Sequence, residues 1–173
     1  SSDFRSKAII AIILSWLAIL VYVTWRFEFR YAMGGILALV HDTLIVIGAV
    51  SFLNMEFTIN ILAALVFVIG FSINDTIVTL DRIREIVKRN PKQKLGDIIN
   101  LAINETLSRT ILTSLTVFLT LLALYIFGGA VIRDFTFALL VGTIVGTYST
   151  IYIACTSVLL FEKIRLPKPA RKK

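Results

Sequence analysis

The feature that most constrains this chain is a run of 18 residues without a charge, residues 57–74, which ends directly before Asp75. Similar uncharged runs make up most of the remaining sequence. A helix needs about 20 mostly apolar residues to cross the hydrocarbon core of a bilayer. Hydrophobic residues make up 57% of the chain, against roughly 45 to 50% in soluble domains. The sequence therefore predicts an all-α, polytopic membrane protein and argues against a soluble helical one.

Five transmembrane helices are predicted when the two runs on either side of Asp42 are joined into one. No proline lies inside any of them, so we expect uninterrupted helices. The external connections are too short to fold, and we treat residues 1–173 as a single transmembrane domain. The predicted spans are residues 8–25, 31–53, 57–80, 110–127 and 135–161.

The longest connection, residues 81–109, divides at Asn90 and Pro91. Its first part continues the third helix out of the membrane. Its second part, residues 94–107, has apolar residues at i, i+3 and i+4 spacing with polar positions between them. We expect an amphipathic helix on the inner membrane surface, serving as an elbow or as a docking face for a cytoplasmic partner.

The distribution of basic residues predicts the orientation. With residues 81–109 placed in the cytoplasm, 15 of the 18 lysines and arginines lie inside, and Arg5, Lys7 and Arg133 lie outside. This asymmetry predicts an external N-terminus and a cytoplasmic basic tail, residues 162–173. The net charge of +7 then reflects topology and attraction to anionic lipids, and no nucleic-acid partner is expected. Because the chain starts outside without a signal of its own, we expect an upstream helix to precede it.

Asp75 and Arg109 are the leading candidate functional residues. Hydrocarbon cannot solvate a carboxylate, so Asp75 must be neutral, find a cation or line a wet cavity. It lies seven residues before Arg82, about 10 Å from the inner boundary, and Arg109 enters from that same face. Burial favours a neutral carboxylic acid and a guanidinium favours the carboxylate, so this pair can gain and lose protons. We predict a proton relay; the alternative is a static ion pair that fixes helix register.

Asp42 is a weaker relay candidate near the middle of its span, with no obvious cation in this chain. We expect it to stay protonated or to form a hydrogen bond with Asn74, Ser72 or Thr43. Histidine is a common proton carrier in proteins, but adjacent helix positions point about 100° apart, so His41 and Asp42 cannot both face one partner. We therefore assign His41 mainly a structural role. No metal site is expected, since the chain has one histidine and one cysteine.

Small residues indicate close helix packing in the last predicted span. Gly142 and Gly146 form a G-x-x-x-G motif, which lets helix backbones approach closely. The motif serves packing within the bundle or an interface to another subunit. Cys155, on the same helix, is a lone thiol, and we expect it to be chemically inert and to serve only in packing.

An enzymatic function is not expected. Two acids on consecutive membrane helices also suggest an intramembrane aspartyl protease. The members of that class resemble one another in a tyrosine-aspartate pair and a glycine-any-glycine-aspartate motif. The flanks here are HD around Asp42 and SIND before Asp75, and no ATPase or hydrolase motif is present.

Four stretches of sequence resemble the SecF group of the SecD/SecF family of protein-export membrane proteins. They are ALVHDTLIVIG, GFSINDTIVTLDRIRE, NETLSRTILTSLTVFLTLLAL and GGAVIRDFTFALLVGTIVGTYSTIYIA. The resemblance covers nearly the whole chain, with Ile86 as a small departure from an asparagine that is frequent in the family. Members have six spans and a periplasmic domain after the first, so this chain is similar to spans two to six.

The resemblance implies a function in protein export. A SecF-like chain would pair with SecD in a pseudo-symmetric unit of the resistance-nodulation-division superfamily. In the bacterial or archaeal cytoplasmic membrane, that unit would help the SecYEG channel export unfolded preproteins with the proton motive force. Asp75 and Arg109 match positions implicated in proton passage, with protons as the coupling ion and no other cofactor. A structural scaffold of the translocon, or the membrane half of another proton-driven exporter, remain as alternatives.

Overall fold

The computed structural model describes the backbone of residues 2–165 and the side chains of residues 6, 7, 10 and 13–161. Every regular element in this part of the chain is helical, which confirms the predicted all-α class. The elements are α1 (Ser2–Arg26), α2 (Phe29–Phe52), α3 (Ile59–Arg89), α4 (Leu95–Phe127), α5 (Ala130–Ser149), the π-helical turn η1 (Thr150–Ala154) and α6 (Cys155–Arg165).

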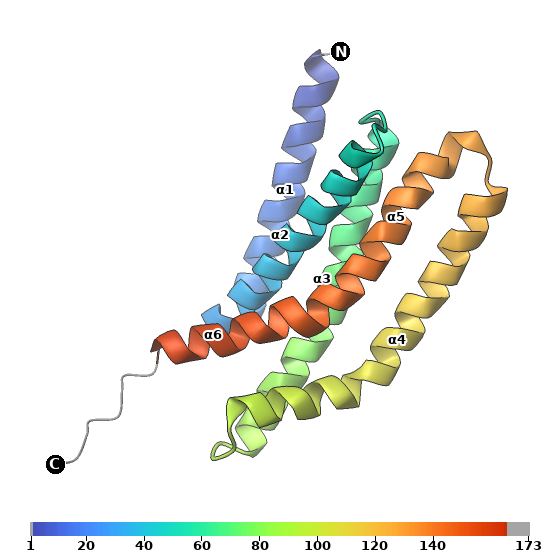
Figure 1. Ribbon diagram of the computed structural model, residues 1–173. Coiled ribbons are helices and arrows are strands. Elements are labelled where there is room, and N and C mark those ends of the chain that lie inside the picture. The colour runs from blue at the N-terminus through green and yellow to red at the C-terminus, as the bar shows by residue number, and fades with distance from the viewer. Residues whose placement is uncertain (1, 166–173) are drawn as a thin grey trace.

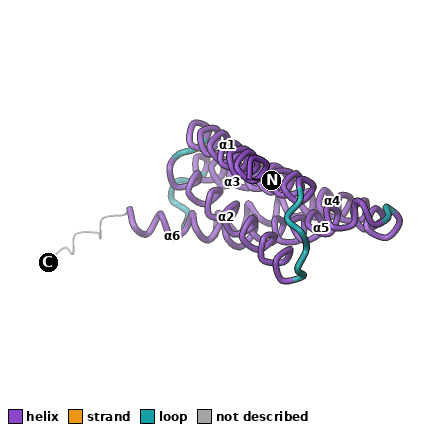
Figure 2. The backbone as a smooth tube through the Cα atoms, turned by 90° about the horizontal axis from the view of Figure 1, so that it is seen from above, coloured by secondary structure: helices purple, strands orange, loops and turns teal. Residues whose placement is uncertain are grey.

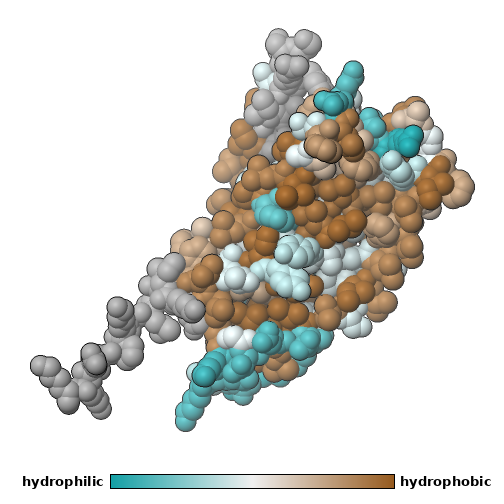
Figure 3. All heavy atoms as spheres, viewed as in Figure 1, coloured by the Kyte–Doolittle hydropathy of each residue, from teal (hydrophilic) through white to brown (hydrophobic). Residues whose placement is uncertain are grey.

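Four helical segments are long and apolar enough to cross a membrane. They are α2, α3, α4 and the continuous path of α5, η1 and α6 from Ala130 to Phe161. In α1, residues Ile13–Arg26 form a shorter apolar helix. Figure 3 shows an apolar band across the middle of the molecule, with hydrophilic atoms gathered at its ends. The polytopic class is confirmed, and the count of five spans stays a prediction.

The central helix is α3, which packs against α1, α2, α4, α5 and η1. Figure 1 shows α4 and α5 as an antiparallel hairpin on the side of the bundle away from α1, and Figure 2 shows the same order from above. The helices join through short turns. Gly129 precedes α5 with φ 76°, a left-handed conformation that glycine adopts without steric cost.

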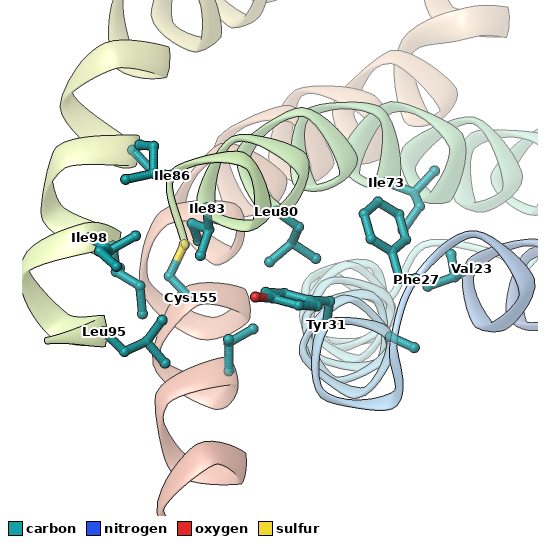
Figure 4. Packing of buried hydrophobic residues seen from close by; sticks show 14 of the residues in the cluster. Val23, Phe27, Tyr31, Ile73, Leu80, Ile83, Ile86, Leu95, Ile98 and Cys155 are labelled. Carbon is teal, nitrogen blue, oxygen red and sulfur yellow. The ribbon is translucent and has the colours of Figure 1, made fainter. Parts of the chain in front are cut away.

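The predicted amphipathic segment is the first part of α4 rather than a separate helix. Figure 1 shows α4 crossing under the bundle and then bending upward. The apolar side chains of its first part are buried, including Leu95 (8% exposed) and Ile98 (2%). Figure 4 shows these two beside Ile83, Ile86 and Cys155, so the apolar face packs on the end of α3 and the start of α6. The connection between α3 and α4 is therefore a short turn, residues 90–94.

The last predicted span is not an uninterrupted α-helix. The turn η1 interrupts it at Thr150–Ala154, and Figure 1 shows the chain changing direction between α5 and α6. The Cys155 thiol donates to the Thr150 carbonyl, five residues back. Polar side chains can interrupt a helix without proline when they bond its own carbonyls, which is why counting prolines missed this turn. Of the predicted basic tail, residues 166–173 lie outside the described residues.

Candidate functional site

Asp75 lies inside the bundle on a buried stripe of α3. Residues at three- and four-residue spacing share one face of a helix, and Val68, Ser72, Asp75 and Thr79 are all 3% exposed or less. Among the described residues, the Oδ2 atom of Asp75 is buried without a hydrogen-bond partner. A buried carboxyl oxygen that lacks a partner is destabilising, and more so when it is charged. The side chain therefore requires a proton or a polar partner, such as water, that the described side chains do not supply.

Arg109 on α4 lies close enough for its positive charge to act on Asp75. No ion pair within 4.0 Å joins the two among the described side chains. Arg109 is exposed, so its head group can stay hydrated while Asp75 is enclosed. The structure therefore brings the two predicted relay residues into the same region without a direct contact between them.

Arg109 borders an open, charged cleft between α3 and α4. The cleft has a volume of about 670 Å³. Arg82 bonds both Glu85 on its own helix and Glu105 on α4. These hydrogen bonds raise the pKa of Arg82, and the bond from Arg82 lowers the pKa of Glu85. The cleft is lined by Val78, Asp81, Arg82, Glu85, Glu105, Thr106 and Arg109.

Asp42 on α2 is fully buried, and its carboxyl group contacts polar side chains of α3, α5 and its own helix. Ser72 on α3 donates to its Oδ2 atom at 2.5 Å, and Ser149 on α5 donates to the same oxygen at 2.8 Å. Its Oδ1 atom lies 3.1 Å from Nδ1 of His41, whose side chain is 31% exposed. Adjacent helix positions do point apart, but the imidazole turns back onto Asp42 and is itself the partner.

Glycines bring α5 onto α3 and so set the position of Ser149. A Cβ atom added at Gly142 would lie 2.1 Å from Cγ2 of Val68, and one at Gly146 would lie 3.1 Å from Cβ of Ser72. Neither residue can gain a side chain unless its neighbours move. The G-x-x-x-G motif therefore lies against α3 within the bundle, one turn before Ser149.

The three predicted hydrogen-bond partners of Asp42 differ in their outcome in the structure. Ser72 forms the suggested bond, whereas the hydroxyl of Thr43 bonds the Leu39 carbonyl at 2.8 Å on its own helix. Asn74 is exposed on α3 and is not bonded to Asp42. Ser149 was not predicted as a partner of Asp42, although its position one helical turn after the G-x-x-x-G motif could have indicated it. Within the described residues, no group of three histidine, cysteine or acidic side chains could hold a metal ion.

Comparison with known proteins gives close relatives over almost the full chain. Residues 1–164 match the family described as "Protein export membrane protein SecD/SecF, C-terminal". The chain is 50% identical to the protein translocase subunit SecF of Calditerrivibrio nitroreducens over 166 residues, which is 95% of this chain and 55% of the relative. It is 51% identical to the SecF subunit of Magnetococcus marinus over 160 residues, 92% of this chain and 51% of that one.

A longer relative and a solved structure extend the comparison. The protein translocase subunit SecDF of Thermus thermophilus is 44% identical over 170 residues, 98% of this chain and 23% of the relative. A crystal structure of SecDF in a super-membrane-facing form superimposes with a TM-score of 0.89 at 44% identity, over 95% of this chain and 22% of that chain. This chain spans about half the length of the SecF relatives that it matches.

Proposed function

Because this chain belongs to the SecD/SecF family of protein-export membrane proteins, we propose that it forms the membrane part of a proton-driven subunit of the Sec translocase. The subunit pairs with SecD and helps the SecYEG channel move unfolded preproteins across the cytoplasmic membrane. The relatives named SecF, and the SecDF relative of Thermus thermophilus, support this assignment. The chain acts without hydrolytic chemistry, and protons are its coupling ion.

The observation that carries the proposal is the buried Oδ2 atom of Asp75, which has no hydrogen-bond partner among the described residues and lies within the influence of the Arg109 charge. An ionised Asp75 is held by attraction to Arg109, and a protonated one is not. Proton entry from outside therefore removes an attraction between α3 and α4, and the two helices change their tilt. The proton leaves through the charged cleft beside Arg109.

The energy available is sufficient for such a change. One charge that crosses the membrane supplies about 2.3 kcal/mol per 100 mV, so a few protons provide more than the energy of a single ion pair. Five spans, an external N-terminus and a cytoplasmic C-terminus complete the proposed arrangement, in which the basic residues also attract anionic lipids.

Replacing Asp75 by asparagine tests the assignment. In inverted membrane vesicles that hold the full-length protein with SecD, Asp75→Asn should abolish the part of preprotein export that depends on the proton gradient. Assembly with SecD should persist, because the amide has the same shape as the acid. Asp134→Asn is the matched control, since Asp134 is an exposed acid on α5, and it should export normally.

Two alternatives give different results in the same vesicles. A purely structural scaffold tolerates the paired neutral variant Asp75→Asn with Arg109→Gln, with proton flux and export unchanged. The membrane half of another exporter would move protons through Asp75 without an effect on preprotein export. Unchanged proton-driven export in Asp75→Asn would refute the assignment.

A further inference from the structure

A second buried acid lies away from Asp75, at the junction of α2, α3 and α5. We propose that Asp42 and His41 form a second proton-holding site in the bundle, whose protonation loosens the hydroxyl contacts that tie α2 to α3 and α5. The inference rests on the proposed function, because it assumes that protons reach the interior of this bundle.

The hydrogen bonds distinguish the two oxygens of Asp42. Its Oδ2 atom accepts from both Ser72 and Ser149, so this oxygen has two donors. Its Oδ1 atom faces Nδ1 of His41 at 3.1 Å, and a proton between these atoms can sit on either one. The Oδ1 atom is therefore the place where an added proton is held.

The imidazole of His41 provides a path to Asp42. The carboxyl group is fully buried, whereas the His41 side chain is 31% exposed, so the ring is the member of the pair that a proton donor outside this chain can contact. The Nε2 atom of His41 binds the incoming proton. The N–H bond at Nδ1 of the same ring then breaks, and that proton moves to Oδ1 of Asp42. The imidazole returns neutral in its other tautomer, and Asp42 has gained one proton.

No other charge is placed to neutralise Asp42. Among the described residues, His41 is the one basic side chain within 4.0 Å of it. The titratable groups on neighbouring helices include Asp75, which lies one helical turn along α3 from Ser72, and the buried Cys155 thiol of α6. Tyr148 and Tyr152 are 53% and 58% exposed and point away from the bundle. An ionised carboxylate without a neighbouring cation is destabilising inside the bundle. Binding of a proton removes that charge.

Protonation of Asp42 changes contacts between helices. Hydrogen bonds to a carboxylate are roughly twice as strong as those to a neutral group. A proton on Asp42 therefore weakens the Ser72 and Ser149 bonds together, and α2 is held less firmly to α3 and α5. One turn further, Thr76 bonds Thr150 of η1 at 2.9 Å, so the loosened region includes the π-helical turn where the last helix bends.

Infrared difference spectroscopy of the full-length protein with SecD tests the inference. Spectra recorded across a pH step in an Asp75→Asn background should include a carboxylic acid band of Asp42, which is identified by subtracting the spectrum of the same protein with Asp42→Asn added. The band should be lost in Asp42→Asn and retained in Asp134→Asn. Ser149→Ala and Ser72→Ala should each shift its frequency, because each removes one hydrogen bond from the carboxyl group. His41→Gln should slow proton uptake after a pH jump on the order of 100-fold.

The outcomes separate this inference from the proposed function. The second site is overturned if Asp42→Asn removes no carboxylic acid band, or if the band that it removes is unchanged in both serine variants, while the export assay on Asp75→Asn judges the proposed function on its own. Asp42→Asn keeps an oxygen that can accept from both serines, and copurification with SecD checks its assembly. If Asp42→Asn fails to assemble with SecD, the two serine variants provide the test. An Asp42 carboxyl group that never changes its protonation state gives no pH-dependent band for these variants to shift.

Discussion

Substitution of Gly142 by alanine tests the close approach of α5 to α3, on which the position of Ser149 depends. The new Cβ atom would lie 2.1 Å from Cγ2 and 2.7 Å from Cγ1 of Val68. Carbon atoms in contact are about 3.5 to 4.0 Å apart, so the helices must separate on the order of 1 Å. Val68 cannot turn aside freely, because a valine in a helix has one strongly preferred rotamer and this one is 1% exposed.

Two opposing effects set the expected magnitude. Overpacking of a closely packed interior costs about 1–3 kcal/mol, whereas replacing a glycine inside a helix by alanine returns about 0.5–1 kcal/mol. We therefore expect Gly142→Ala to lower the free energy of unfolding by up to about 2.5 kcal/mol. Gly70→Ala is the matched control, because a Cβ atom there meets nothing within 4 Å, and it should raise stability by about 0.5–1 kcal/mol.

The measurement is equilibrium unfolding of the full-length protein in mixed micelles, followed by the loss of helical signal. The difference between Gly142→Ala and Gly70→Ala removes the contribution of helix propensity and isolates the clash. Adding Val68→Ala to Gly142→Ala should recover part of the loss, because the two residues are in contact and their effects couple. Equal stability of Gly142→Ala and Gly70→Ala, or no recovery in the double variant, would show that the two helices do not touch here.

Two further predictions concern Cys155 and Glu85. Cys155 is 2% exposed, so a maleimide should label it slowly in the folded protein and quickly after denaturation; fast labelling in native micelles would contradict its burial. The Arg82 hydrogen bond lowers the pKa of Glu85 below the ordinary 4.5, so the stability that ionised Glu85 contributes is complete above pH 4.5 and lost as pH falls through the lowered value. Unfolding of the parent protein and of Glu85→Gln, compared from pH 7 to pH 3, should converge at low pH, and a constant difference would exclude this ion pair as its source.

Much of the helical architecture follows from the sequence, because hydropathy and helix spacing are local properties. The uncharged run before Asp75 predicted a membrane helix, and α3 covers all but its first two residues with one unbroken helix that continues beyond Asp81. The spacing of Leu95 and Ile98 predicted an amphipathic helix on the inner membrane surface. Both side chains are buried in the first part of α4, and the cytoplasmic placement stays a prediction. The π-helical turn at Thr150 was not predicted, because it depends on side-chain bonds to backbone carbonyls that no apolar pattern records.

The candidate site was only partly readable from the sequence. Asp75, Arg109 and Asp42 were conspicuous because charged residues are rare in apolar runs, and Ser72 was a correct partner for Asp42. Asn74 was a reasonable partner by composition, but its helix position directs it outward. Helical phase relative to neighbouring helices decides this, and the sequence of one helix does not contain it.

The sequence by itself determined that the chain forms apolar helices with a few ionisable groups among them, since backbone hydrogen bonds in hydrocarbon must be satisfied within each helix. Tertiary structure alone decided which groups meet. Ser149 reaches Asp42 across 107 residues of sequence because Gly142 and Gly146 leave room for α5 to lie against α3. The same packing encloses Asp75 and leaves its Oδ2 atom without a hydrogen-bond partner in the described part of the chain. The choice of contacts depends on how closely two surfaces can approach, and that is a property of the assembled bundle.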